Sequence, residues 1–131
     1  MSRNKALTFA AVWAALQLAR ILSFPTIQNI ISGSDAVEWL YPSIIDVLIG
    51  LSAPLIAFFI WRKNSVWPRL TTLIWFSVSL LEHIETIGLN IVSLKPDAFF
   101  GTTQSAIALE LAIFAMLDAI ALVVVAKQTL K

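Results

Sequence analysis

The 131-residue sequence contains no cysteine, only one histidine and few charged residues. The absence of cysteine excludes disulfides, thiolate metal ligands and cysteine nucleophiles. Charged residues make up 13% of the chain and hydrophobic residues 59%, whereas about a quarter of a soluble domain is charged. A formal net charge of +1 does not provide the basic surface that nucleic-acid binding requires. We therefore expect an integral membrane protein whose partner is the lipid bilayer, with no nucleic acid bound.

The sequence contains long apolar segments with few charged residues. A spanning helix needs about 20 mostly apolar residues, and four segments meet that requirement, at approximately 5–24, 43–61, 69–94 and 104–126. No small-residue cleavage site follows the first segment, so we interpret it as a helix and not as a signal peptide. The sequence predicts an all-α integral membrane protein with a single domain, 1–131. Its expected fold is a four-transmembrane-helix antiparallel up-down bundle.

Basic residues gather at one end of this predicted bundle. The two loops at the other end contain three acidic residues, Asp35, Glu38 and Asp97, and one basic residue, Lys95. Because positive loops stay on the cytoplasmic side, we expect both termini and the 62–68 loop to be cytoplasmic in a multi-pass protein of the cell membrane. The basic residues are Arg3, Lys5, Arg62, Lys63, Arg69, Lys127 and Lys131.

The connector after the first segment has signals for short helices. Pro25 is suited to open a helix and Gly33 to close it. Asp35 and Glu38 have the spacing of a capping box for a second turn. We interpret this stretch as a short interfacial helix on the outer surface, or alternatively as a lid over an outward-facing pocket.

Aromatic and small residues mark further positions. Trp39 and Tyr41 suit one membrane–water boundary, and Trp61 and Trp67 suit the other. Pro54 predicts a kink in the second segment, beside small residues that allow close helix packing.

Polar side chains converge between the middle of the predicted bundle and its outer end. Glu82 and His83 lie near the middle of the third segment, with Glu85 and Asn90 about one and two turns further outward. These residues share one side of their helix. The candidate binding residues are Glu82, His83, Glu85, Glu110, Arg20, Asn90, Asp118 and Asp46, with Trp75, Trp13 and Phe114 as aromatic walls.

This region contains more acid than the chain neutralises. A charged group at the centre of a span costs about 2.5–3.5 kcal/mol. We expect Arg20 to neutralise Glu110 or Glu85, and a protonated His83 to neutralise another acid. The remaining carboxylates must share protons or meet a bound cation, an amine ligand or water. The five acids are Asp46, Glu82, Glu85, Glu110 and Asp118.

A transition-metal site is disfavoured. Glu82 and Glu85 lie about 60° apart in helical projection, while His83 points to a different gap. One histidine and no cysteine provide too few nitrogen and sulfur ligands. We expect neither a metal nor a resident cofactor.

Three functions remain open. The first is binding or translocation of a proton, a cation or a small protonatable ligand, with aromatic rings adding cation–π contacts and a homodimer forming the transport unit. The second is an enzyme that isomerises, cyclises or opens the epoxide of a lipophilic substrate. Its acid and base would be Glu82, Glu85 and Glu110, with His83 beside them. The third is an accessory subunit of a larger membrane complex, held by partner helices.

Overall fold

The computed structural model describes residues 3–62, 66–92 and 103–129. Every regular element in these ranges is helical, which confirms the predicted all-α class. The three later segments lie close to their predicted positions. The elements are α1 (Arg3–Leu16), the 3₁₀ helix η1 (Gln17–Ser23), α2 (Phe24–Ile31), the 3₁₀ helix η2 (Val37–Trp39), α3 (Leu40–Arg62), α4 (Val66–Val92) and α5 (Gln104–Thr129).

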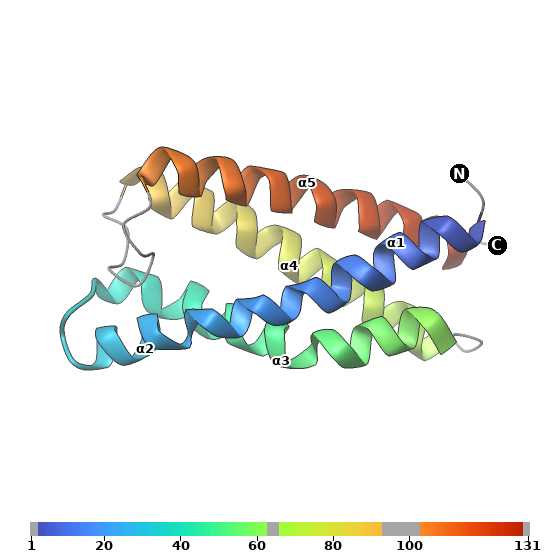
Figure 1. The fold of residues 1–131 in the computed structure, drawn as a ribbon, viewed down its shortest axis with the longest axis horizontal. Coiled ribbons are helices and arrows are strands. Elements are labelled where there is room, and N and C mark those ends of the chain that lie inside the picture. Colours follow the sequence, from blue (N-terminus) through green and yellow to red (C-terminus); the bar gives the residue numbers. More distant parts are fainter. Residues whose placement is uncertain (1–2, 63–65, 93–102, 130–131) are drawn as a thin grey trace.

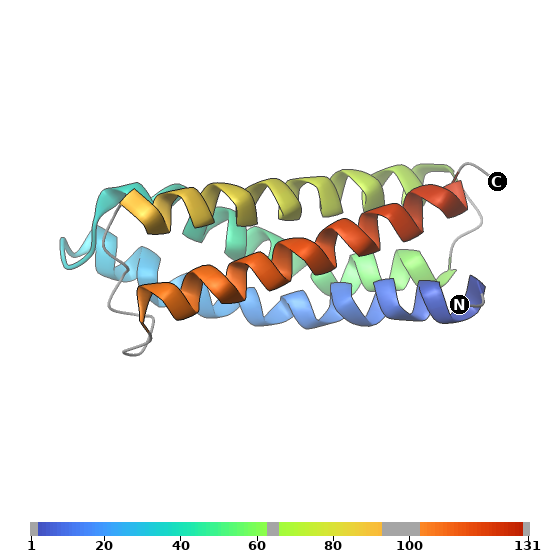
Figure 2. The same cartoon turned by 90° about the horizontal axis from the view of Figure 1, so that it is seen from above.

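The helices lie side by side as an elongated bundle. α1, η1 and α2 follow one another in one rod, and α3, α4 and α5 form the neighbouring rods (Figure 1). α1 packs against α3 and α5, and α4 packs against the same two helices. Successive rods run in opposite directions, so α1 begins and α5 ends at the same end of the bundle (Figure 2).

Three helical stretches in the described ranges are long and apolar enough to cross a membrane: Lys5–Ile31, Val37–Trp61 and Gln104–Gln128. Their outer surfaces remain apolar, as a bilayer requires: Leu22 is 73% exposed and Leu51 62%. α4 is also long, at 27 residues, and most of its polar side chains are buried, including Glu82 and His83. These features are consistent with a membrane protein.

Small residues let the helices approach each other in the half of the bundle near the start of α1. Ala10, Ala14, Ala53 and Ala121 are all 0% exposed, and small side chains at helix contacts allow close backbone packing. Phe76, also 0% exposed, belongs to the same cluster. This half of the interior is therefore filled by apolar groups.

The change from α1 to η1 sets the direction of three polar residues. In a 3₁₀ helix residues three apart lie directly above one another, so Gln17, Arg20 and Ser23 share one side of the rod. Pro25 lacks the N–H of a regular α-helical turn and crowds the carbonyl four residues earlier. The N–H of Phe24 accordingly bonds Ile21, three residues back.

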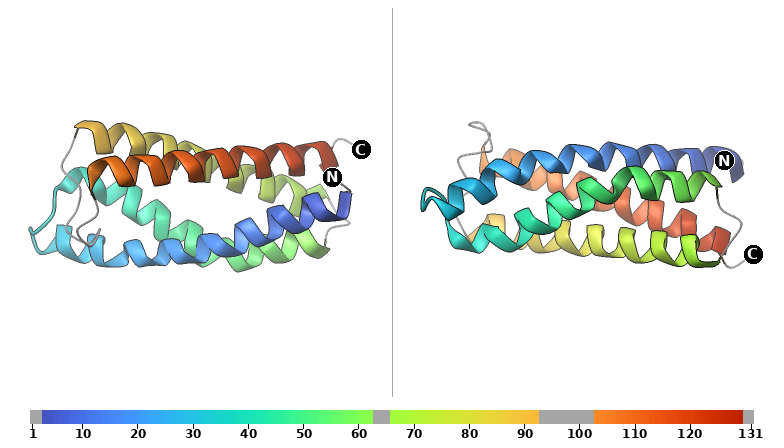
Figure 3. Two further views of the ribbon diagram at one scale, coloured as in Figure 1. Left: turned by 45° about the horizontal axis from the view of Figure 1, so that its top comes forward. Right: turned by 90° about the horizontal axis from the view of Figure 1, so that it is seen from below.

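Gly50 of α3 receives this part of the rod. A Cβ atom at Gly50 would lie 2.8 Å from the backbone nitrogen of Ile21 and 3.3 Å from the carbonyl carbon of Arg20. Only glycine fits that approach without displacing η1. α3 also changes direction midway (Figure 3), near Pro54, which lies inside the helix as predicted.

The connector differs from its prediction in two respects. α2 does end just before Gly33, whose φ is +79°, but α2 continues the first rod because Ser23 and Phe24 both keep right-handed helical backbone angles. The short helix that begins beside Pro25 and ends before Gly33 is present, but it is not separate from the first rod. The capping box is also wrong, since Ala36 is the N-cap of η2 and has no side chain that accepts a hydrogen bond.

The boundary aromatics are divided between the surface and the core. Trp61 and Trp67 are 71% and 77% exposed, and Tyr41 is 58% exposed, as expected for aromatic belts. Trp39 is only 2% exposed. It packs inside the bundle and does not face the boundary.

Candidate functional site

Asp118 of α5 lies at the centre of a buried polar cluster. Its side chain is 0% exposed. Trp13 Nε1 donates to Oδ1 over 2.7 Å and Gln17 Nε2 over 3.0 Å. Ser79 Oγ donates to Oδ2 over 2.6 Å, and His83 Nδ1 lies 2.9 Å from the same oxygen. These four contacts equal the acceptor sites of an ionised carboxylate, and His83 Nδ1 donates to Asp118 in the tautomer that carries its proton on Nδ1.

Arg20 of η1 connects two further acids. Its side chain is 9% exposed and forms ion pairs with Asp46 of α3 and Glu82 of α4. The expected pairing of Arg20 with Glu110 or Glu85 is wrong. The 3₁₀ register turns Arg20 into the space between α3 and α4, and the two acids that face this space take the guanidinium.

Ser79 and Gln17 join these two groups into one network. Ser79 Oγ accepts from Arg20 over 2.8 Å while donating to Asp118. Gln17 Oε1 accepts from Arg20 over 3.3 Å while its amide nitrogen donates to Asp118. We call the connected set the interior polar network. Its members are Trp13, Gln17, Arg20, Ser23, Asp46, Ser79, Glu82, His83, Thr86 and Asp118.

The network reaches the surface at Asp46. The Asp46 side chain is 23% exposed and accepts from Ser23 Oγ over 2.7 Å. Glu82 is 4% exposed and accepts from Thr86 one turn along its helix. On the other side of Asp118, the interior continues as the apolar cluster of alanines with Phe76. Asp46 is therefore the most exposed of the three acids in the network.

The network has an imbalance of charge. Three carboxylates meet one guanidinium, leaving two uncompensated negative charges when His83 is neutral and one when it is an imidazolium. An uncompensated charge in a low-dielectric interior costs several kcal/mol. The described residues of the network therefore contain more acid than base.

Aromatic rings line one side of Asp118. The Phe114 ring lies 5.5 Å from that of Trp13 and 5.8 Å from that of His83, centroid to centroid. His83 Nε2 makes no hydrogen bond with any residue in the described ranges. Trp75 lies outside the network, because its Nε1 donates to Ser52 Oγ over 2.8 Å.

Three candidate residues lie away from the network. Glu85 and Glu110 are exposed on the outside of α4 and α5. The buried side of α4 includes Glu82, His83 and Thr86, and Glu85 projects beyond its edge. Asn90 Nδ2 donates to the carbonyl of Gln104 over 2.9 Å, and the Gln104 amide returns a bond to Asn90. Asn90 therefore ties the end of α4 to the start of α5.

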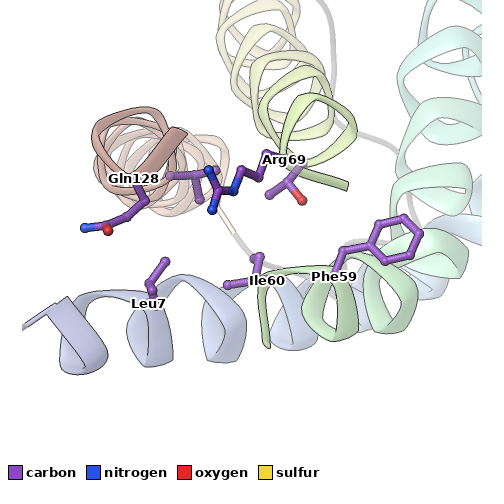
Figure 4. Close-up of a pocket in the computed structure, with 7 residues that line it drawn as sticks. Leu7, Phe59, Ile60, Arg69 and Gln128 are labelled. Carbon is purple, nitrogen blue, oxygen red and sulfur yellow. The ribbon is translucent and has the colours of Figure 1, made fainter. Parts of the chain in front are cut away.

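The arrangement of the donors is unlike a metal site. In the described ranges, no three His, Cys, Asp or Glu side chains are placed to hold one metal ion. A pocket does exist, but at the opposite end of the bundle, between Leu7, Ile60, Arg69 and Gln128 (Figure 4).

Comparison of the chain with protein-family models, with curated proteins and with solved structures finds no match. The functional conclusion therefore depends on the residues of this chain.

Proposed function

We propose that the chain crosses the cell membrane four times, with both termini and the α3–α4 connection in the cytoplasm. Three of its helical stretches are apolar enough to span. α4 joins them because its buried Glu82 and His83 pair with Arg20 and Asp118 of neighbouring helices. The basic residues at one end support the orientation.

Within this membrane protein, we propose that the interior polar network binds and exchanges a proton. The observation that carries the proposal is the excess of buried carboxylate over guanidinium around Arg20. A proton is the smallest positive charge that restores the balance, and it needs no coordination shell. His83 Nε2 is the proposed receiving atom, because Nδ1 is directed at Asp118.

Exchange is expected from one side. Asp46 provides the exposed end of the network, while the alanine-rich core separates Asp118 from the basic end. We therefore expect proton binding at His83 to respond to the pH on the side where Asp46 is exposed. This one-sided binding is the step that a proton-coupled membrane transporter, or its proton-binding subunit, requires.

Proton uptake by the purified protein in lipid nanodiscs tests this function. Ordinary glutamates bind few protons between about pH 8 and pH 5, so uptake in that window reports histidine and the network. Glu82→Gln removes one buried negative charge and should reduce uptake by about one proton per chain. The matched control Glu38→Gln, at an exposed site, should leave it unchanged. Identical uptake curves for wild type and Glu82→Gln would contradict the proposal.

The accessory-subunit function is a second candidate, favoured by the exposure of Glu85 and Glu110. A glutamate on the lipid side of a spanning helix is costly, and a partner helix would relieve that cost. We expect Glu85→Gln or Glu110→Gln to change the stoichiometry measured by native mass spectrometry. A wild type and variants that are all monomeric would argue against the accessory-subunit function. The pocket in Figure 4 is lined by other residues than Glu82 and so gives the enzyme function no support.

A further inference from the structure

An arginine without a partner lies at the basic end of the bundle. Within the described ranges, Arg69 of α4 makes no hydrogen bond or ion pair, and its Nε is buried. A buried N–H of a charged group is stabilised by an acceptor. Arg69 therefore provides a donor position that no residue in the described ranges satisfies.

The surroundings of Arg69 form a shallow pocket that opens to the outside. Leu7, Ile60 and Val125 provide an apolar wall from three different rods. Figure 4 shows Arg69 reaching from α4 toward α5, over Leu7 and Ile60. Gln128 of α5 lines the same pocket, and its Oε1 is buried without a partner. The pocket thus contains one cationic donor and one neutral acceptor.

The pocket lies at the level where lipid headgroups are expected. Trp61 follows Ile60 directly and is 71% exposed, and Trp67, two residues before Arg69, is 77% exposed. Exposed tryptophans mark the membrane–water boundary. Lys5 and Lys127 are exposed at the same end, and such basic clusters attract anionic lipids. A neighbouring lipid can therefore place its phosphate at Arg69.

We propose that this pocket binds the headgroup of an anionic glycerophospholipid that carries a hydroxyl, such as phosphatidylglycerol. The phosphate accepts from Arg69, and the headgroup hydroxyl donates to Gln128 Oε1. The apolar wall meets the glycerol and the start of the acyl chains. This site is separate from the interior polar network, so it does not depend on proton binding.

Native mass spectrometry of the full chain in detergent, with added phosphatidylglycerol or phosphatidylcholine, tests the site. Wild type should retain phosphatidylglycerol in preference to phosphatidylcholine. Arg69→Gln should reduce that retention about tenfold or more, as loss of a charge-assisted hydrogen bond predicts. Lys127→Gln is the matched control, because it removes the same charge at the same end from an exposed position. It should reduce retention about twofold or less, as for a charge that attracts lipid only across solvent.

Several results would overturn the proposal. Equal losses of phosphatidylglycerol retention in Arg69→Gln and Lys127→Gln would show that the basic residues attract the lipid without a specific pocket. Displacement of the lipid by an equal concentration of inorganic phosphate would assign the site to a free anion. A lack of preference for phosphatidylglycerol would exclude the site altogether.

Gln128→Leu provides a second variant that removes no charge, should Arg69→Gln fail to fold. It should lower retention of phosphatidylglycerol to the level of phosphatidic acid, which has no headgroup hydroxyl. Unchanged selectivity in Gln128→Leu would contradict the assigned role of Gln128.

Discussion

His83 Nδ1 lies 2.9 Å from Asp118 Oδ2, joining α4 to α5 inside the bundle. Both side chains are buried, with exposures of 3% and 0%. Asp118 fixes the orientation of the imidazole, and Nε2 is the nitrogen to which we assign proton binding. The same carboxylate connects through Ser79 to Arg20, which pairs with Glu82 and Asp46.

Removing the Ser79 hydroxyl should weaken this connection. Ser79→Ala leaves both Arg20 and Asp118 with one hydrogen bond fewer, and hydrogen bonds to charged groups contribute about 1.5–3 kcal/mol. We expect the free energy of unfolding in mild detergent to fall by that amount. Ser77→Ala is the control, because Ser77 bonds only the carbonyl of Leu73 in its own helix. Equal effects of the two changes would argue against the bridging role.

Arg20 should be more important for stability than either of its acids alone. Arg20→Gln leaves Glu82 and Asp46 without compensation, and breaking a buried pair in this way costs about 3–5 kcal/mol. Arg20→Lys should recover only part of the loss, since an ammonium lacks the fork that reaches two acids.

A double variant distinguishes the energy of the Arg20–Glu82 ion pair from the effects of each substitution on packing. Arg20→Gln with Glu82→Gln should be more stable than the sum of the two single changes predicts, in a double-mutant cycle of unfolding free energies. Strict additivity would mean that the two residues are not energetically coupled.

Gly50 should tolerate no side chain. The Cβ added by Gly50→Ala would lie 2.8 Å from the Ile21 backbone nitrogen, so η1 must move, at a cost of about 1–3 kcal/mol. Gly88→Ala is a matched control in α4, where a Cβ meets nothing within 4 Å. Because alanine is the better helix former by about 1 kcal/mol, Gly88→Ala should be neutral or stabilising. A thermal unfolding series in detergent distinguishes the two, and an equally tolerant Gly50 would contradict the described contact.

Composition and run length were sufficient to predict the helical class and the places of α3, α4 and α5. The end of the first rod was not predictable in the same way. Pro25 follows Phe24 as an ordinary helix opener would, yet the chain accommodates it by adopting 3₁₀ turns before it. Periodicity alone gives no sign of that choice.

Only some of the candidate site residues were predicted correctly from the sequence. Depth and charge pointed to Arg20, Asp46, Glu82, His83 and Asp118, which the structure joins in one network. Depth alone did not distinguish buried Glu82 from exposed Glu85, since that difference depends on the rotation of α4. Ser79 precedes Glu82 by three residues and so lies on the same side of α4, but no sequence signal marks a serine that bridges two ionised groups.

The charge state of His83 tests the central claim most directly, because the chain has a single histidine. ¹⁵N-histidine labelling of the protein in oriented liposomes gives one Nδ1 and one Nε2 signal by NMR. We predict that Nδ1 stays protonated. The Nε2 signal should show protonation when the pH is lowered on the Asp46 side of the membrane, and no change when it is lowered on the side of the basic residues. An Nε2 signal that does not change with the pH on either side of the membrane, or that changes equally with both, would contradict one-sided proton binding by the interior polar network.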